Sequence, residues 1–157
     1  DCDLTAFIMA AAAGDLEDCE AAIDLMSSSP PQLDFDVNVQ GAGGVTALFM
    51  ASSNGRLEVV RSLLRARAKP EVADEKRRTP LHGASYNGHL KICQALLEAG
   101  ASANAKNTHD KYAFDEAAMR GHAEICELLK EAALKDSETE LRVGSQVEIH
   151  GLTSAAG

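Results

Sequence analysis

The chain has 157 residues, of which 45% are hydrophobic but only 4% aromatic, with no Trp. This length fits one domain, whose core must be built from Ala, Leu, Ile and Val, and such small side chains suit closely packed helices. The net charge of −9 is uneven, since nine acidic residues and no Lys or Arg precede Arg56, whereas 15 acids and 15 bases follow. This acidic end would repel phosphates, which argues against nucleic acid as a partner there.

The first expected helix lies in a segment, residues 5–14, that returns three times along the chain. The later copies begin at Thr46, Thr79 and Tyr112, so the last two steps are equal in length. The first step is longer, and an insertion at residues 27–35 explains the difference, because its Ser-Ser-Ser-Pro-Pro stretch lets a loop lengthen at little cost. A fixed period in this range is typical of a repeat solenoid.

Each repeat is expected to hold two helices, most clearly in the third. Thr79 can cap the first helix, with a Pro at its first position, and Gly88 can end it. From Leu90 to Leu97 the apolar residues recur at helical spacing, and Gly100 can close that second helix in the left-handed conformation. A single pair of helices cannot bury such a stripe, so the repeats must stack.

The motifs around these helices match a known family. They are Thr79-Pro80-Leu81-His82, Gly88-His89-Leu90 and Gly100-Ala101. In these motifs and in the period, residues 3–135 resemble the ankyrin-repeat family, whose signature includes Thr-Pro-Leu-His. The resemblance implies an all-α repeat solenoid of about four stacked helix–turn–helix units, each with a β-turn finger, over residues 1–136. It also implies that the His82 imidazole hydrogen-bonds within and between turns.

Three positions depart from this family pattern. Arg77 and Asp110 occupy turn positions where the family usually has Gly, and Arg67 replaces a helix-ending Gly. A non-Gly residue at positive φ costs on the order of 1 kcal/mol. Either these turns differ locally or the chain tolerates the strain.

The residues that could carry chemistry are expected to be structural. Cys19, Cys93 and Cys126 share one repeat position and are predicted core residues, and their free thiols suggest a reducing, intracellular compartment. No pair of Cys or His has metal-ligand spacing, and no phosphate loop or nucleophile motif is present. We therefore expect a soluble, non-catalytic protein with no cofactor, no transmembrane helix and no secretory signal.

The resemblance implies that a partner protein docks on the concave face formed by the fingers and first helices. The residues that the family pattern places there are Val45, Asn54, Lys76, Arg77, Arg78, Tyr86, Asn87, Lys111, Met119 and Arg120. Five of them, Lys76, Arg77, Arg78, Lys111 and Arg120, are hypothesised to form a basic patch that grips an acidic or amphipathic segment. The alternative is that these cations are simply solvated.

The repeat pattern stops after Leu134. Residues 135–140 are expected to be a polar linker, and residues 137–157 a linker and extended tail in which residues 143–152 alternate like one strand. That strand could open a truncated β-domain, add to another protein's sheet, or belong to a disordered tail. An alternative function follows, a structural subunit that contacts a larger complex through its acidic N-terminal end and this strand.

Overall fold

The computed structural model describes residues 2–28 and 36–138, and in this part the chain forms helices, turns and loops only. The helices come in pairs joined by a tight turn. In chain order they are α1 (Cys2–Ala13), α2 (Leu16–Ser27), α3 (Ala47–Ser53), α4 (Leu57–Arg65), α5 (Pro80–Asn87), α6 (Leu90–Glu98), α7 (Ala113–Met119) and a last helix over residues 123–138. A short 3-10 helix, η1 (Ala42–Gly44), lies before α3. The all-α repeat solenoid of four units predicted from the sequence is confirmed.

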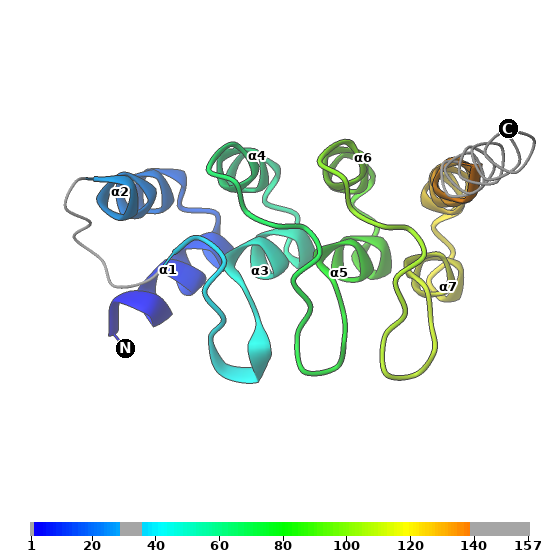
Figure 1. Ribbon diagram of the computed structural model, residues 1–157, viewed down its shortest axis with the longest axis horizontal. Helices are drawn as coiled ribbons and strands as arrows, with labels where there is room; N and C mark the ends of the chain where they lie inside the picture. Colours follow the sequence, from blue (N-terminus) through cyan, green and yellow to red (C-terminus); the bar gives the residue numbers. More distant parts are fainter. Residues whose placement is uncertain (1, 29–35, 139–157) are drawn as a thin grey trace, which may run out of the picture.

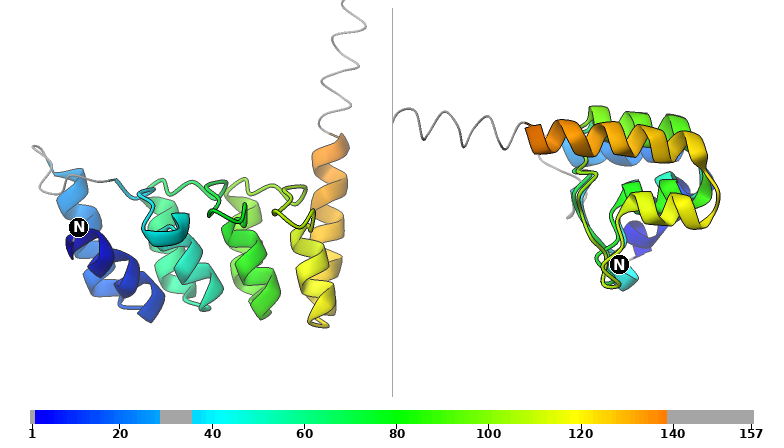
Figure 2. Two further views of the ribbon diagram at one scale, coloured as in Figure 1. Left: turned by 90° about the horizontal axis from the view of Figure 1, so that it is seen from below. Right: turned by 90° about the vertical axis from the view of Figure 1, so that its right-hand side faces the viewer.

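The helices lie in two parallel rows (Figures 1 and 2). An inner row contains α1, α3, α5 and α7, and an outer row contains α2, α4, α6 and the last helix. Three loops, the fingers, project from the inner row at residues 36–46, 66–79 and 99–112 (Figure 1). Neighbouring fingers are joined through their backbones, since the Glu75 N–H donates to Gly43 O and the Thr108 N–H to Lys76 O, each at 3.0 Å.

The helix ends follow from local residues. At the start of α3, Thr46 Oγ1 accepts a hydrogen bond from the Phe49 N–H at 3.1 Å, and α5 ends at Gly88 in the left-handed conformation, with φ of 80°. Arg67, Arg77 and Asp110 have φ of 67°, 57° and 55°. These turns therefore keep the geometry that usually takes Gly, and the chain tolerates the strain, roughly 1 kcal/mol at each position.

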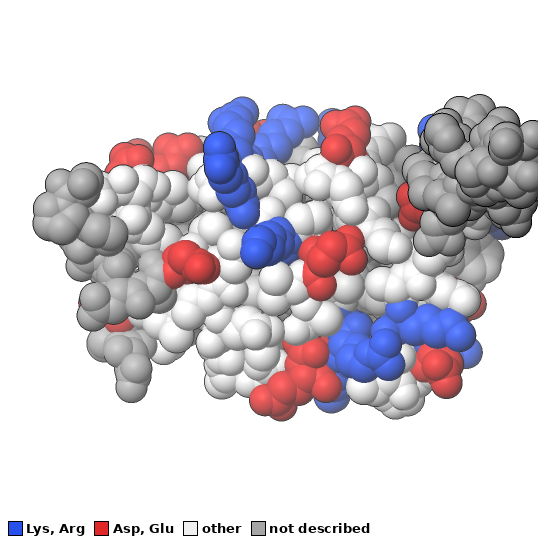
Figure 3. Space-filling model, viewed as in Figure 1, with Lys and Arg blue, Asp and Glu red and all other residues white. Residues whose placement is uncertain are grey.

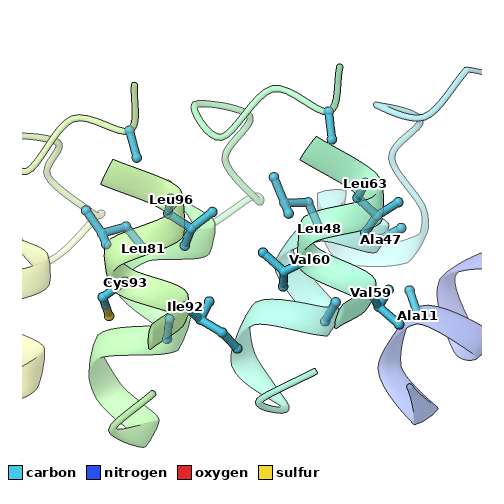
Figure 4. Packing of buried hydrophobic residues seen from close by; sticks show 14 of the residues in the cluster. Ala11, Ala47, Leu48, Val59, Val60, Leu63, Leu81, Ile92, Cys93 and Leu96 are labelled. Carbon is cyan, nitrogen blue, oxygen red and sulfur yellow. The ribbon is translucent and has the colours of Figure 1, made fainter. Parts of the chain in front are cut away.

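The core runs between the two rows as a series of repeated layers (Figure 4). Leu48 and Leu63 lie in the core of the second repeat, and Leu81 and Leu96 lie in the core of the third. Each of these side chains is at most 1% exposed. Cys19 and Cys93 are fully buried free thiols, and burial raises the pKa of each to about 11. Cys126 is only partly buried, so the prediction that it is a core residue was too strong.

The C-terminal boundary differs from the sequence-based expectation. The last helix continues to residue 138, so the linker predicted from Lys135 is helical at its start. The chain has Ala133 at the position one repeat after Gly100, so it lacks the left-handed Gly that could end the helix at that point. The predicted strand at residues 143–152 lies outside the described residues. None of the helices in residues 2–28 and 36–138 is long and apolar enough to cross a membrane.

Candidate functional site

A groove of about 430 Å³ crosses the inner row and spans three repeats. Its lining comes from α3, the second finger, α5 and α7, namely Phe49, Ser53, Arg78, His82, Gly83, Tyr86, Asn87 and Glu116. At Gly83, α5 lies so close to α3 that an added Cβ would overlap the Ser53 hydroxyl.

Arg78 lies at one wall of this groove, and its charge is compensated. Its Nη2 and Nε donate to Asp74 Oδ2 at 2.6 and 2.8 Å, and the Asp74 side chain is only 2% exposed. The other oxygen, Asp74 Oδ1, accepts the backbone N–H groups of Lys76 and Arg78 at 2.9 and 2.8 Å. The guanidinium also lies 5.3 Å from the centroid of the Phe49 ring. Arg78 is thus a fixed wall rather than a free cation of the hypothesised patch.

Tyr86 also lines the groove, and Arg120, which lies outside the lining, stacks on its ring. The guanidinium carbon of Arg120 lies 4.7 Å from the centroid of the Tyr86 ring, and its Nη1 lies 3.5 Å from the Tyr86 hydroxyl. Both side chains are exposed, and the pair joins the third repeat to the fourth. Tyr and Arg are among the residue types enriched at the anchors of protein interfaces, and a cation–π contact at an exposed site favours this stacked arrangement by about 0.5–1 kcal/mol.

The other predicted cations lie on the fingers, beyond the groove. Lys76, Arg77 and Lys111 are exposed, and Figure 3 shows Lys and Arg gathered over the fingers with carboxylates beside them. Glu75 and Asp110 are among the exposed acids of the same fingers. The surface is therefore of mixed charge, and the structure separates the hypothesised patch into free cations on the fingers and compensated or stacked arginines at the groove.

The remaining predicted residues have other surroundings. Asn87 Nδ2 donates to Ser53 O at 2.9 Å, and Asn54 Nδ2 donates to Ala12 O at 3.0 Å, so both amides link neighbouring repeats. Val45 is partly buried and packs against the core. Met119, by contrast, is 66% exposed at the end of α7.

His82, which the sequence analysis placed in a structural role, faces the groove from α5 but is only 2% exposed. Its Nδ1 accepts the Thr79 N–H at 3.2 Å, so Nε2 carries the proton and donates to Lys111 O at 3.1 Å. The bonds within and between turns that the resemblance implied are confirmed. Burial lowers the pKa of this imidazole, which keeps it neutral.

Sequence reasoning missed Phe49, Gly83 and Glu116 as lining residues. The register of the repeats contains a signal for them, because Phe49 aligns with His82 and Gly83 aligns with Glu116. Two adjacent positions near the start of the first helix thus line the groove in consecutive repeats. Within the described residues no group of three or more His, Cys, Asp or Glu could hold a metal ion.

Comparison with known proteins agrees with this architecture. A family model described as ankyrin repeats (3 copies) matches residues 7–107, which is more than half of the chain. No curated protein sequence matches the chain significantly.

Proposed function

Since this chain belongs to the ankyrin-repeat family, whose members are generally protein–protein interaction modules, we propose that it is an adaptor or scaffold that binds a segment of a partner protein in the inner-row groove. The observation that carries the proposal is the exposed Tyr86–Arg120 stack, 4.7 Å from guanidinium carbon to ring centroid, in which Tyr86 lines that groove and Arg120 lies beside it. Members of the family are typically non-catalytic, which agrees with this proposal.

The groove favours an amphipathic partner with acidic residues at its margins. Arg78 is already paired with Asp74, and Glu116 adds a carboxylate to the lining, so the groove itself carries no net positive charge. An apolar side chain of the partner would pack on the Tyr86 ring. Its acidic residues would reach Arg120 and the finger cations, where solvent-exposed pairs guide association more than they stabilise the complex.

The stack also lowers the cost of binding. Arg side chains lose up to about 2 kcal/mol of conformational entropy when they are ordered. Arg120 is already ordered against Tyr86, so less of this entropy remains to be lost when a partner binds. The two side chains can therefore act as one preformed anchor.

A random peptide library displayed on phage tests the proposal. Selection on the wild-type chain is expected to enrich peptides with a bulky apolar residue flanked by Asp or Glu. These peptides should bind Tyr86→Ala/Arg120→Ala about tenfold more weakly or worse, which corresponds to about 1.4 kcal/mol.

The matched control is Glu127→Ala/Lys130→Ala, which removes an exposed pair with a 3.0 Å contact on the last helix. Peptide affinity should not change in this variant. Equal binding to the Tyr86/Arg120 variant and the wild type, or no enrichment at all, would contradict the groove as the binding site. The alternative of a structural subunit, with contacts through the acidic end and residues 143–152, stays a prediction, as does the intracellular location.

A further inference from the structure

The charges of this chain are segregated into three consecutive blocks. Residues 1–55 carry nine acids and no base, residues 56–91 carry nine bases and four acids, and residues 92–157 carry six bases and eleven acids. The block charges of −9, +5 and −5 add to the net charge of −9. A basic middle therefore lies between two acidic ends.

The outer row displays the first two blocks side by side. The exposed charged residues of α2 are all acidic, namely Glu17, Asp18, Glu20 and Asp24. The next helices of the outer row, α4 and α6, expose three bases, Arg61, Arg65 and Lys91, and two acids, Glu58 and Glu98. Figure 3 shows this change along the upper edge of the molecule, from carboxylates over α2 to cations over α4.

A second groove, of about 580 Å³, lies between α4 and α6. Its charged border consists of three cations and one acid, namely Arg61, Arg65, Lys91 and Glu98. Arg61 contacts Glu58 at 3.1 Å, but both side chains are at least half exposed, and such surface pairs contribute at most about 1 kcal/mol. Neither Arg65 nor Lys91 has an ion pair within the described part of the chain.

The acids of α2 are not neutralised by this groove within one molecule. The ion pairs among residues 2–28 and 36–138 are Arg61–Glu58, Arg78–Asp74 and Lys130–Glu127, none of which joins α2 to α4. Glu20 lies at the α4 side of α2, where its carboxylate accepts a 3.3 Å hydrogen bond from the Ser62 hydroxyl. Complementary charges therefore lie next to each other on one face without pairing.

We propose that a second copy of this chain docks its α2 on the α4–α6 groove, forming a symmetric dimer through the outer rows. Glu20 and Asp24 are four residues apart on α2, and Arg61 and Arg65 are four residues apart on α4, so each pair spans one helical turn. Helix α2 and the groove are neighbours in the outer row. A two-fold axis near α4 would therefore place α2 of each copy on the groove of the other copy, so that both contacts form at once. Such an interface is closed and does not lead to fibres.

The salt dependence of association shows whether net repulsion or local charge complementarity dominates. Two copies of net charge −9 repel each other, and added salt would weaken this repulsion and favour association. Local complementarity has the opposite dependence. A dimer held by α2 and the groove should be present at about 0.1 M salt and lost at about 1 M, where the screening length falls from about 10 Å to about 3 Å.

Charge reversal in sedimentation-velocity experiments provides the decisive test. The variants Glu20→Lys/Asp24→Lys and Arg61→Glu/Arg65→Glu should each be monomeric at about 0.1 M salt, where the wild type is dimeric. An equal mixture of the two should form a mixed dimer, because each acidic or basic surface then meets its complement. A lysine at position 20 can keep this hydrogen bond with its direction reversed, by donating to the Ser62 hydroxyl oxygen, and circular dichroism checks that each variant is folded.

Three outcomes would overturn the proposal: a monomeric wild type at low salt, a dimer that strengthens with salt, or a mixture that stays monomeric. The variant Glu20→Lys/Asp24→Lys also separates the two electrostatic effects, because it reduces the magnitude of the net charge, from −9 to −5. Net repulsion alone would make that variant associate more than the wild type, whereas complementarity makes it associate less. None of these substitutions lies in the inner-row groove, so peptide binding there tests the proposed function separately.

Discussion

The third and fourth repeats use the same helix start for different purposes. In the third, His82 Nδ1 accepts the Thr79 N–H at 3.2 Å, and in the fourth, Asp115 Oδ2 accepts the Tyr112 N–H at 2.8 Å. Either acceptor bonds a backbone N–H at the start of the helix that has no carbonyl partner within the helix. Only the imidazole has a second, donating nitrogen, which His82 directs to Lys111 O in the next finger.

The second repeat completes the comparison. It has Phe49 at this position, whose ring cannot accept, and the helix start is capped at a different donor, since the hydroxyl of Thr46 accepts the Phe49 N–H. The cap of a helix can therefore be supplied by several residue types. A side chain at this position that also bonds the next finger needs one group that accepts and another that donates, and His82 makes this bond from the third repeat to the fourth.

Core truncation should separate inner from terminal repeats most strongly. Leu81 is fully buried in the third repeat, and Leu81→Ala is expected to lower the free energy of unfolding by about 3 kcal/mol, from lost apolar contact and the cavity left behind. The control is Leu134, which is 66% exposed on the last helix. Leu134→Ala should change the free energy of unfolding by less than about 0.5 kcal/mol. Urea unfolding followed by circular dichroism measures both, and similar losses would contradict the layered core.

Removing the His82 side chain should have the next largest effect. His82→Ala leaves the Thr79 N–H and Lys111 O without these partners and is expected to cost about 2 kcal/mol in urea unfolding. His109→Ala, an exposed histidine on the third finger, should cost little by comparison. If both substitutions cost the same, the bonds of His82 do not stabilise the junction.

The period and the local signals were enough to predict the fold. Helix α5 begins after Thr79 and ends at Gly88 as expected, because caps and left-handed glycines act through residues close in sequence. The start of the predicted linker was placed differently. The apolar pattern weakens after Leu134, yet the backbone is still helical over residues 135–138.

The candidate site was predicted only in part. Tyr86, Asn87 and Arg78 line the groove as expected by position. The pairing of Arg78 with Asp74 was missed, because it depends on the folded path of the second finger, which buries the carboxylate. Gly83 was missed although it aligns with Glu116, because the close approach of α3 to α5 at this residue is visible only in the folded chain.

Two glycines test what the neighbouring repeat adds to a turn. Gly88 and Gly121 occupy the same position in consecutive repeats, with φ of 80° and 77°. Alanine at Gly121 meets no neighbour within 4 Å and should cost only the backbone strain, about 1 kcal/mol. At Gly88 the new methyl would lie 2.6 Å from His122 Cε1 and displace a ring that bonds Tyr86 O at 3.1 Å, so the cost should be about twice as large. Equal costs in urea unfolding would show that His122 adapts freely.

The smallest expected effect is the pH dependence of the same junction. Burial lowers the pKa of His82 below its ordinary value of 6.5, so below pH 6.5 the unfolded chain binds a proton at this imidazole that the folded chain excludes. Stability is therefore lost as pH falls from 6.5 toward the folded pKa, by about 1 kcal/mol at most between pH 7 and about pH 5.5. His82→Gln can still accept the Thr79 N–H but does not titrate, so the fall in its urea midpoint over this range should be smaller than in the wild type. An equal fall in both would assign the pH dependence to other groups.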